Sequence, residues 1–416
     1  MGGDGSAASR AALSEPLKVL CLDIEGGHGG SSRSLYYSLK NIDRSLIAPT
    51  VICRRDGPIR QLYADIGIPV EILADLPKAS ALPRPSRNLW QLVGHLGDFS
   101  GARRGGTLKR LREVVLAHDL VHFNHEGFAA LALWVRRQTH RPATMHIRTN
   151  VQPSIFSRWQ MRTISAAVDH VVFITPHEET TFRSLGGLTP GTVVFNIAEP
   201  ATGAQPHPAI PRDGRLVIAS LSNAAFIRGS DRLLELADAL KRLGRDDVLI
   251  VSAGDMALKG SDWSADLVRL AGRGGSLADA ANSLGLGSRM LFLGHVAEPE
   301  RVLAASDLLI KPTRESNPWG RDILEALSSG KPVLSVGTDQ TFVETGVTGL
   351  LQQHFDADAL AAAIARLADD RAELARMGET ARQRIANLCG PTDRARDLAD
   401  IWFRAARSGT ASGRAA

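Results

Sequence analysis

Short β-rich runs alternate with segments of helical periodicity from one end of the chain to the other. This alternation predicts βα units and parallel sheets. In the first half we expect seven strands, at residues 18–23, 49–54, 69–73, 120–123, 143–147, 170–174 and 192–196. In the second half we expect six strands, at residues 216–220, 248–253, 290–293, 308–311, 332–336 and 350–352. The pattern therefore predicts two α/β domains in tandem.

The segment from residue 199 to residue 214 contains four prolines and no periodicity, which is typical of an inter-domain linker. From residue 356 onward the pattern is helical: one helix to residue 367, a second over residues 372–388, and a final amphipathic helix after Pro391. The predicted organisation is a disordered tail (1–16), a first domain (17–200), a linker (201–214), a second domain (215–390), a C-terminal helix (391–407) and a disordered tail (408–416).

The amino-acid composition limits the classes of protein to which this chain can belong. The 416 residues are 44% hydrophobic, so the chain has enough apolar residues for a sizeable core. The formal charge of +5 is unevenly distributed, because residues 1–210 carry 23 basic and 17 acidic residues and the remainder carry 26 and 27. This surplus is too small to indicate a nucleic-acid partner, but it can mark a surface in the first half that meets an anionic partner.

The chain carries few signals for secretion or for metal binding. Its three cysteines form no CxxC or Cys/His cluster, so buried thiols in a reducing cytosol are expected. The Gly/Ala/Ser-rich start lacks the apolar region of a signal peptide, and the longest apolar run, residues 128–135, is too short to span a bilayer. With no Asp-x-Asp pair near a strand end, no obligatory metal is expected.

The turn after the first predicted strand contains four glycines, at positions 26, 27, 29 and 30, and a helix follows it. Glycines let backbone N–H groups approach a ligand, and a helix N-terminus favours an anion, so the turn is a candidate phosphate cradle. A tight turn without a ligand is the alternative. A dinucleotide fingerprint and a P-loop are excluded, because neither spacing can be written through these residues.

A second informative stretch runs from residue 311 to residue 334. A strand is expected to end at Lys311, a polar loop to cross residues 315–319, and a helix to open near Gly320 with Glu325 in its second turn. Carboxylates accept hydrogen bonds from sugar or ribose hydroxyls, and amides at a helix N-terminus suit a diphosphate. The alternative is that the pairs Arg314/Glu315 and Arg321/Asp322 are solvated surface pairs.

These residues resemble the large family of retaining glycosyltransferases with the GT-B fold, often called family 4 or glycosyl transferases group 1. The resemblance covers nearly the whole chain and is strongest over residues 302–351, where the segments 305–313, 320–333 and 344–351 follow the family pattern in order. It implies an α/β fold of the GT-B type, in which two Rossmann-like domains face each other across a cleft. It also implies a nucleotide diphosphate sugar as donor and co-substrate, held mainly by the second domain, and an acceptor held mainly by the first.

The resemblance assigns roles to individual residues. Glu325 corresponds to a ribose-binding glutamate and His146 to an active-site histidine near the reacting sugar. Arg228 corresponds to the basic residue that neutralises the diphosphate. The remaining donor-binding positions that it implies are glycines and residues at the helix start: Gly29, Gly30, Gly229, Gly320, Arg321 and Asp322.

The chain departs from the family pattern in two places. Counting back from Glu325 to the family's first glutamate leads to Asn317, and the nearest glutamate is Glu315, so either side chain can fill that role. The arginine that the family has ahead of Arg228 falls on Ser222 or Asn223. One of the two usual phosphate-binding cations is therefore absent from its expected position.

A basic segment follows residue 100 and contains no acidic residue before residue 113. Its cations are Arg103, Arg104, Lys109, Arg110 and Arg112, and an amphipathic stretch, residues 89–99, precedes it. Such a segment fits a membrane-surface patch for a lipid-linked acceptor, and a solvated helix face is the alternative. We expect a cytoplasmic location with peripheral association at the inner face of an anionic membrane.

The sequence therefore predicts a retaining glycosyltransferase that moves a hexose-like sugar to a lipid-linked or saccharide acceptor, as in cell-envelope or polysaccharide biosynthesis. The alternative is a non-catalytic nucleotide-sugar-binding protein on the same scaffold, which the missing arginine and the displaced glutamate favour. Two further histidines, His122 and His125, flank the end of the fourth strand and are expected to be packed or solvent-facing.

Overall fold

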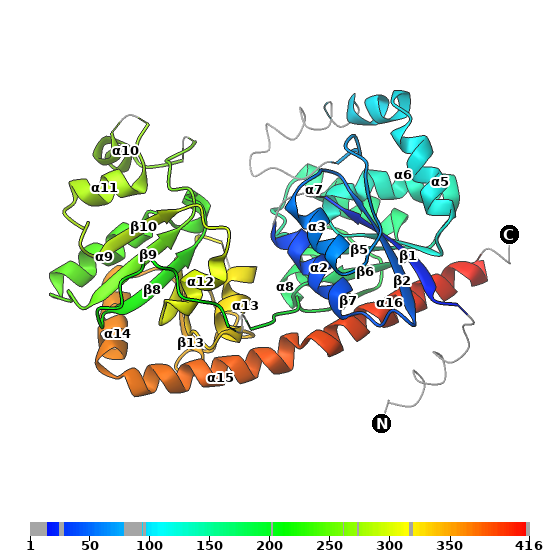
Figure 1. Cartoon of the computed structure of the whole chain (residues 1–416). Helices are drawn as coiled ribbons and strands as arrows, with labels where there is room; N and C mark the ends of the chain where they lie inside the picture. Colours follow the sequence, from blue (N-terminus) through cyan, green and yellow to red (C-terminus); the bar gives the residue numbers. More distant parts are fainter. Residues whose placement is uncertain are drawn as a thin grey trace. The chain divides into compact units, whose positions relative to one another are not determined.

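The computed structural model describes residues 15–24, 29–78, 94, 97–200, 203–260, 262–272, 274–315 and 319–412. The chain folds into two compact units (Figure 1). Unit 1 comprises Met1–Ile197 together with Pro391–Ala416, and unit 2 comprises Ala198–Gly390. The C-terminal helix, which the sequence analysis set apart, thus belongs to the first unit.

Unit 1 contains a seven-stranded parallel sheet with the order β3-β2-β1-β4-β5-β6-β7. Its strands are β1 (Leu17–Asp23), β2 (Ile47–Cys53), β3 (Val70–Ile72), β4 (Leu120–Phe123), β5 (Ala143–Ile147), β6 (His170–Phe173) and β7 (Gly191–Val193). The central strands are buried on both faces because helices cover each side.

Each face of this sheet has its own apolar core. The helices of unit 1 are α2 (Gly30–Asn41), α3 (Pro58–Asp65), α5 (Thr107–Leu116), α6 (Ala129–Thr139), α7 (Ile155–Ala167), α8 (Pro176–Ser184) and α16 (Pro391–Ser412), with a 3-10 turn η1 (Glu126–Phe128). Leu20 and Leu22 of β1 pack on one face with α5, α6 and α7. Val19 and Cys21 pack on the other with α2, α3 and α16. Successive side chains of β1 therefore point alternately into the two cores.

Helix α16, red in Figure 1, contacts α2 and the strands β4 and β5. Its residues Leu398, Ile401 and Trp402 are at most 1% exposed, and Trp402 is the largest fully buried side chain of the chain's described part. The amphipathic pattern that predicted this helix is explained by this packing, because its apolar stripe completes the core of unit 1.

Unit 2 repeats the same architecture with a six-stranded parallel sheet of order β10-β9-β8-β11-β12-β13. Its strands are β8 (Leu216–Leu221), β9 (Val248–Ala253), β10 (Met290–Gly294), β11 (Leu308–Lys311), β12 (Val333–Val336) and β13 (Gly349–Gln352). Its helices are α9 (Arg232–Arg242), α10 (Ala265–Ala271), α11 (Leu277–Ser283), α12 (Pro299–Ala304), α13 (Arg321–Ser328), α14 (Ala357–Asp369) and α15 (Arg371–Cys389), with a 3-10 turn η2 (Phe226–Arg228).

The thirteen predicted strands are confirmed, with ends that differ from the prediction by at most three residues. In both sheets the strand order reverses beside the first strand of the unit, at β1/β4 and at β8/β11. Open α/β sheets bind ligands outside the carboxyl ends of the strands at such a reversal. A ligand site is therefore expected at the loops that follow these four strands.

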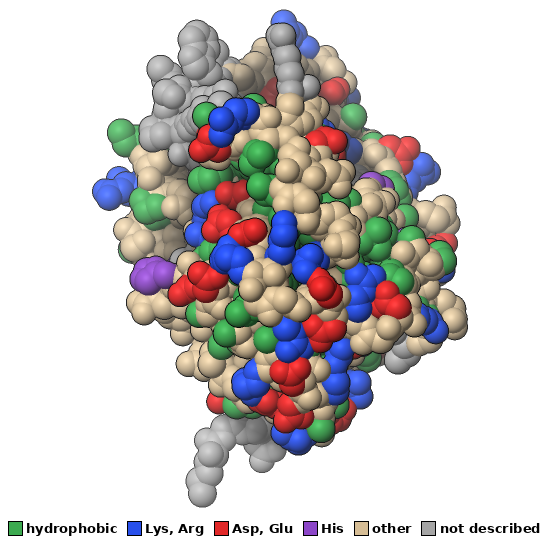
Figure 2. Space-filling view, turned by 90° about the vertical axis from the view of Figure 1, so that its left-hand side faces the viewer, with side chains coloured by type: hydrophobic (Ala, Val, Ile, Leu, Met, Phe, Trp, Pro, Cys, Tyr) green, Lys and Arg blue, Asp and Glu red, His purple; other side chains and the backbone are tan. Residues whose placement is uncertain are grey.

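On the face shown in Figure 2, basic and acidic side chains are interspersed and neither sign forms a continuous area. In the part of the chain that the structure describes, no helix combines the length and the apolar character needed to cross a membrane.

Candidate functional site

The loops after β8 and β11 of unit 2 are joined by close backbone contacts. A Cβ atom built on Gly229 would lie 1.8 Å from the carbonyl oxygen of Pro312, and Gly229 has a φ of +68°. The amide of Arg314 donates to the carbonyl oxygen of Ile227 at 2.8 Å. Both the positive φ and the close approach require glycine at position 229.

Arg314 and Arg232 hold these two loops together. The guanidinium of Arg314 forms a bidentate ion pair with Asp231, with both nitrogen–oxygen distances at 2.7 Å, and lies 3.8 Å from the centre of the Phe226 ring. Arg232 donates to the carbonyl oxygens of Pro312 and Thr313 at 3.1 and 2.7 Å. The positive charge of Arg314 is therefore engaged within the protein.

Arg228 lies on the same pair of loops, but unlike Arg314 its guanidinium is not paired with another described residue. Its side chain is exposed, and its guanidinium has no ion pair or hydrogen bond among the residues that the structure describes. It follows the central strand β8 and directly precedes Gly229, so its position is set by the contact with Pro312. The predicted diphosphate-binding cation is therefore available to a ligand.

The start of helix α13 carries two ion pairs. The Nζ atom of Lys311, the last residue of β11, lies 2.8 Å from Oδ1 of Asp322, and both side chains are 15% exposed. The Nε atom of Arg321 lies 3.0 Å from Oε1 of Glu325. The alternative pairing considered from the sequence is wrong, because Arg314, Arg321 and Asp322 find partners across the fold or one helical turn away instead of their chain neighbours.

These pairs change the expected roles of three predicted site residues. Arg321 and Asp322 are neutralised by Glu325 and Lys311, and Gly320, the N-cap of α13, supplies no side-chain cap. The backbone of the helix N-terminus remains the group suited to an anion. Lys311, which the sequence analysis treated only as a strand end, supplies a cation at this point.

Of the two candidates for the first-glutamate role, Glu315 lies within the described residues. Glu315 is half-buried, its amide donates to Oγ1 of Thr313 at 2.9 Å, and its carboxylate has no ion pair among the described residues. Asn317 lies outside the described residues. Of the positions expected to replace the family's arginine, Asn223 accepts a hydrogen bond from the amide of Asp255 at 2.9 Å. Its amide side chain supports a loop and brings no charge.

In unit 1, His146 lies near the carboxyl end of β5 and is 2% exposed. Its Nδ1 atom lies 2.9 Å from Nε2 of His122 and 3.2 Å from Nη2 of Arg148. The Nδ1 atom of His122 lies 2.8 Å from Oγ1 of Thr144. His122 and Thr144 are register partners on adjacent strands, so strand pairing brings these side chains to one face.

Arg148 links the loops that follow several strands of unit 1. It donates to Oδ1 of Asn124 at 2.7 Å, after β4, and to Oδ1 of Asn196 at 2.6 Å, after β7. Its amide donates to Oε2 of Glu126 at 2.9 Å. Arg148 and Asn124 were not among the site residues predicted from the sequence. Their positions just beyond strand ends are the signal that could have identified them.

A buried carboxylate belongs to the same hydrogen-bond network, through Asn124. Asp23, the last residue of β1, is fully buried and accepts from Ser32 Oγ and Tyr63 OH, each at 2.9 Å. Burial raises the pKa of Asp23, and the hydrogen bonds from Ser32, Tyr63 and Asn124 oppose that shift. Of the glycine turn, Gly29 is the N-cap of α2 and Gly30 its first residue, and the rest lies outside the described residues.

The basic segment after residue 100 divides into two kinds of residue. Arg110 forms a bidentate ion pair with Glu71 of β3, at 2.8 and 2.9 Å. The other four cations, Arg103, Arg104, Lys109 and Arg112, are exposed and have no ion pair among the described residues. Arg110 therefore contributes less to the positive surface than the sequence suggested.

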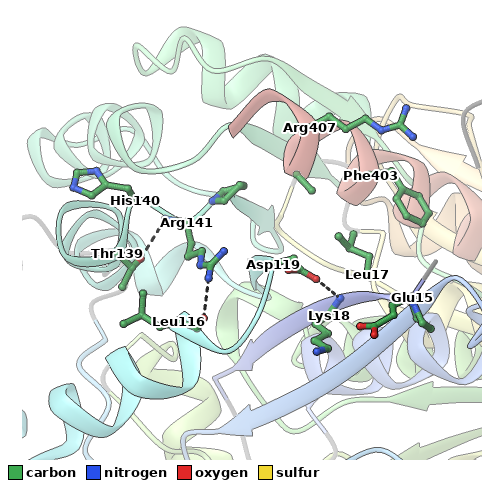
Figure 3. Close-up of a pocket in the computed structure, with 13 residues that line it drawn as sticks. Glu15, Leu17, Lys18, Leu116, Asp119, Thr139, His140, Arg141, Phe403 and Arg407 are labelled. Carbon is green, nitrogen blue, oxygen red and sulfur yellow. Dashed lines mark hydrogen bonds between the residues drawn. The ribbon is translucent and has the colours of Figure 1, made fainter. Parts of the chain in front are cut away.

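A cavity of about 660 Å³ lies elsewhere on unit 1 (Figure 3). It is lined by residues at the starts of β1, β4 and β5, with Phe403 and Arg407 of α16, and it contains the hydrogen bond from the amide of Lys18 to Asp119 Oδ2. This edge is opposite to the carboxyl ends where His146 and Asp23 lie. The cavity is therefore separate from the candidate site.

Within the described residues, no group of three or more His, Cys, Asp or Glu side chains is placed to hold a metal ion. Cys21, Cys53 and Cys389 are buried, and burial raises the pKa of the Cys21 and Cys53 thiols. The described residues of the site offer carboxylates, cations, amides and imidazoles to a ligand.

The chain is similar to several known proteins. Residues 216–370 match the model of the family described as glycosyl transferases group 1. The chain is 26% identical over 386 residues to D-inositol 3-phosphate glycosyltransferase of Streptomyces avermitilis, an alignment that covers 83% of this chain and 81% of that protein. It is 28% identical over 239 residues to D-inositol 3-phosphate glycosyltransferase 1 of Catenulispora acidiphila, which covers 54% of this chain and 55% of that protein. The chain thus spans about half the length of the second of these relatives.

Among solved structures, that of Anabaena Alr3699/HepE in complex with UDP-glucose matches with a TM-score of 0.70 at 23% identity, covering 92% of this chain and 99% of that chain. The predicted resemblance to group 1 glycosyltransferases and the predicted GT-B fold, with two Rossmann-like units, are confirmed. The family match falls on unit 2, which carries Arg228, Gly320 and Glu325.

Proposed function

We propose that this protein is a retaining glycosyltransferase that transfers a hexose-like sugar from a nucleotide diphosphate sugar to a saccharide or lipid-linked acceptor. In this reaction the bond between the anomeric carbon and the diphosphate oxygen breaks. A bond from the anomeric carbon to the acceptor oxygen forms, the proton of that oxygen passes to the departing diphosphate, and the protonated nucleotide diphosphate leaves. Charge builds on the leaving diphosphate, so preorganised cations and amides supply most of the stabilisation.

The observation that carries the proposal is the junction of the β8 and β11 loops in unit 2. The contact of Gly229 with Pro312 brings the exposed Arg228 next to the loop that leads to Glu315 and to the N-terminus of α13. A free cation and uncapped helix amides suit a diphosphate, and carboxylates suit the hydroxyls of a sugar or ribose. The relative from Streptomyces avermitilis is named as a glycosyltransferase, and the Anabaena protein was solved with UDP-glucose.

In the proposed mechanism Arg228 neutralises the leaving diphosphate, and a charge-assisted hydrogen bond of this kind contributes about 1.5 to 3 kcal/mol. Glu325 binds the ribose and Glu315 the sugar hydroxyls. Lys311, through its pair with Asp322, keeps the helix start from repelling a phosphate. We place the acceptor in unit 1, at the carboxyl edge of its sheet beside His146, and expect no obligatory metal.

The test is a panel of nucleotide diphosphate sugars, followed by nucleotide release with acceptor extracts and by thermal shift. Turnover of one sugar nucleotide, lowered in Glu325→Gln and in His146→Gln, is expected. Retention is read from the anomeric configuration of the product by NMR, and an inverted product would contradict the retaining mechanism.

The same panel separates the alternative function. Ser222 or Asn223 stands where the family has a second phosphate-binding arginine, so one cation that would stabilise the leaving diphosphate is missing from its expected position, which favours a protein that binds without turnover. Thermal stabilisation by a nucleotide sugar without nucleotide release from any acceptor would support that binding protein. Neither stabilisation nor release with any nucleotide sugar would reject both functions.

A further inference from the structure

Four polar side chains of unit 1 form one hydrogen-bonded chain between β4 and β5. Thr144 Oγ1 contacts His122 Nδ1 at 2.8 Å, and His122 Nε2 contacts His146 Nδ1 at 2.9 Å. Arg148 Nη2 contacts the same Nδ1 atom of His146 at 3.2 Å. Thr144, His122 and His146 are each at most 2% exposed, so bulk water does not replace these contacts.

The direction of every hydrogen bond in this chain follows from Arg148. A guanidinium has only donors, so Nδ1 of His146 must accept. A proton on that nitrogen would point at a donor of Arg148 and at His122. His146 therefore carries its proton on Nε2, and His122 donates to it through Nε2–H. His122 then accepts a hydrogen bond from the Thr144 hydroxyl at Nδ1. In this assignment each of the three contacts joins a donor to an acceptor, and His122 and Arg148 share the one lone pair on Nδ1 of His146.

Both rings are also kept neutral. Burial and then the charge of Arg148 lower the pKa of His122 to about 3. Burial, Arg148 and His122, in that order, lower the pKa of His146 well below 6.5. His122 also contacts the indole ring of Trp402 on α16, with ring centroids 5.3 Å apart. Arg148 is the charged group that acts on both rings, and it donates to Asn124, whose Nδ2 atom in turn donates to the buried Asp23.

The outcome is an N–H group aimed by the partners of the ring. Nε2 of His146 has no hydrogen-bond partner within the part of the chain that the structure describes. The residue is 2% exposed, and Nε2 is not one of the unpaired atoms that the protein encloses completely. An accessible donor near the carboxyl end of a central strand is suited to an oxygen of a ligand at that edge.

We propose that Arg148 and His122 are positioning residues that hold the proton of His146 on Nε2, so that His146 acts as a neutral hydrogen-bond donor to a sugar hydroxyl oxygen and not as a general base. This inference rests on the proposed function for the sugar, but the tautomer itself is a property of the free protein. A base at this position would need a lone pair where the geometry places a proton.

The first test uses the full chain labelled with ¹⁵N-histidine and a long-range ¹H–¹⁵N correlation spectrum. His146 signals are assigned by their loss in His146→Gln. We expect a protonated Nε2, an unprotonated Nδ1 and no titration between about pH 5.5 and 8. A proton on Nδ1, or protonation of the ring with a midpoint near pH 6.5, would overturn the inference whether or not the protein transfers sugar.

The second test compares two variants of one residue. His122→Phe removes the donor to His146 and keeps a ring against Trp402, whereas His122→Gln keeps an amide N–H. We expect kcat per folded molecule to fall roughly tenfold or more in His122→Phe and to be largely restored in His122→Gln, since a histidine in the wrong tautomer loses its catalytic alignment. Equal kcat in His122→Phe and the wild type would overturn the positioning role. Absence of turnover by the wild type would reject the proposed function and leave the spectrum to decide the tautomer.

Discussion

The carbonyl oxygen of Pro312 occupies the space that a side chain at Gly229 would need, since a Cβ atom there would lie 1.8 Å away. This contact fixes the loop after β8 against the loop after β11, and it places Arg228 at the strand-order reversal of unit 2. A backbone contact of this kind cannot relax by a change of rotamer, so the local geometry of the proposed diphosphate site depends on one glycine.

Gly229→Ala should therefore destabilise the protein and weaken nucleotide binding together. Gly244→Ala is a matched control, because Gly244 also has a φ of +68° but has nothing within 4 Å of its added Cβ. The control should cost about 1 kcal/mol from the left-handed backbone alone, and Gly229→Ala should cost clearly more. Chemical denaturation of both variants measures the difference, and equal losses would show that the loops separate without penalty.

Arg228→Ala should weaken binding of a nucleoside diphosphate by about ten- to a hundredfold, the effect of removing a charge-assisted hydrogen bond of about 1.5 to 3 kcal/mol. Its melting temperature should stay unchanged, because the guanidinium has no partner among the described residues. Arg376→Ala, an exposed arginine on α15, is the control for net charge. Isothermal titration with UDP and with other nucleoside diphosphates measures the effect. An affinity equal to that of Arg376→Ala would remove Arg228 from the site.

The buried histidines predict a direction of pH dependence for stability. The folded-state pKa of His122 is lowered to about 3, below its unfolded value near 6.5, so between these values the unfolded chain binds a proton that the native state does not. The free energy of unfolding attributable to His122 should fall by about 1.4 kcal/mol for each pH unit below 6.5.

Urea denaturation of the wild type and of His122→Gln at pH 7, 6 and 5 isolates this contribution. Other groups, such as His170, whose burial lowers its pKa to about 4, act equally in both proteins. The stability difference between the two should therefore shift in favour of the variant as the pH falls. Parallel stability curves would mean that His122 titrates in the native state as it does in the unfolded chain.

The basic segment predicts selective binding to anionic membranes. Neutralising the four exposed cations Arg103, Arg104, Lys109 and Arg112 to glutamine should remove most binding to vesicles with anionic lipid, because each cation near such a surface contributes about 1 kcal/mol. Arg110→Gln should mainly lower stability, since Arg110 is paired with Glu71. Sedimentation with anionic and with neutral vesicles measures both. Unchanged sedimentation of the fourfold variant would reject a membrane role for this segment.

The sequence by itself determined the thirteen strands, the two α/β units and the resemblance of unit 2 to group 1 glycosyltransferases. These features depend on local patterns and short spacings, such as the strand that ends at Lys311 and the helix that carries Glu325 four residues after Arg321. Local hydrophobic periodicity predicts these elements because each helix or strand buries its own apolar face in the folded protein.

Only the tertiary structure decided which polar groups meet. His122 contacts His146 because parallel pairing sets β4 beside β5 in one register, and the crossover between them spans about twenty residues of helix and loop. The pairs Arg314–Asp231 and Arg110–Glu71 also join residues that are far apart in the chain. In the same way, helix α16 follows unit 2 in the sequence but packs in unit 1. Partners far apart in the chain are selected by the packing of whole elements, which single-residue patterns do not encode.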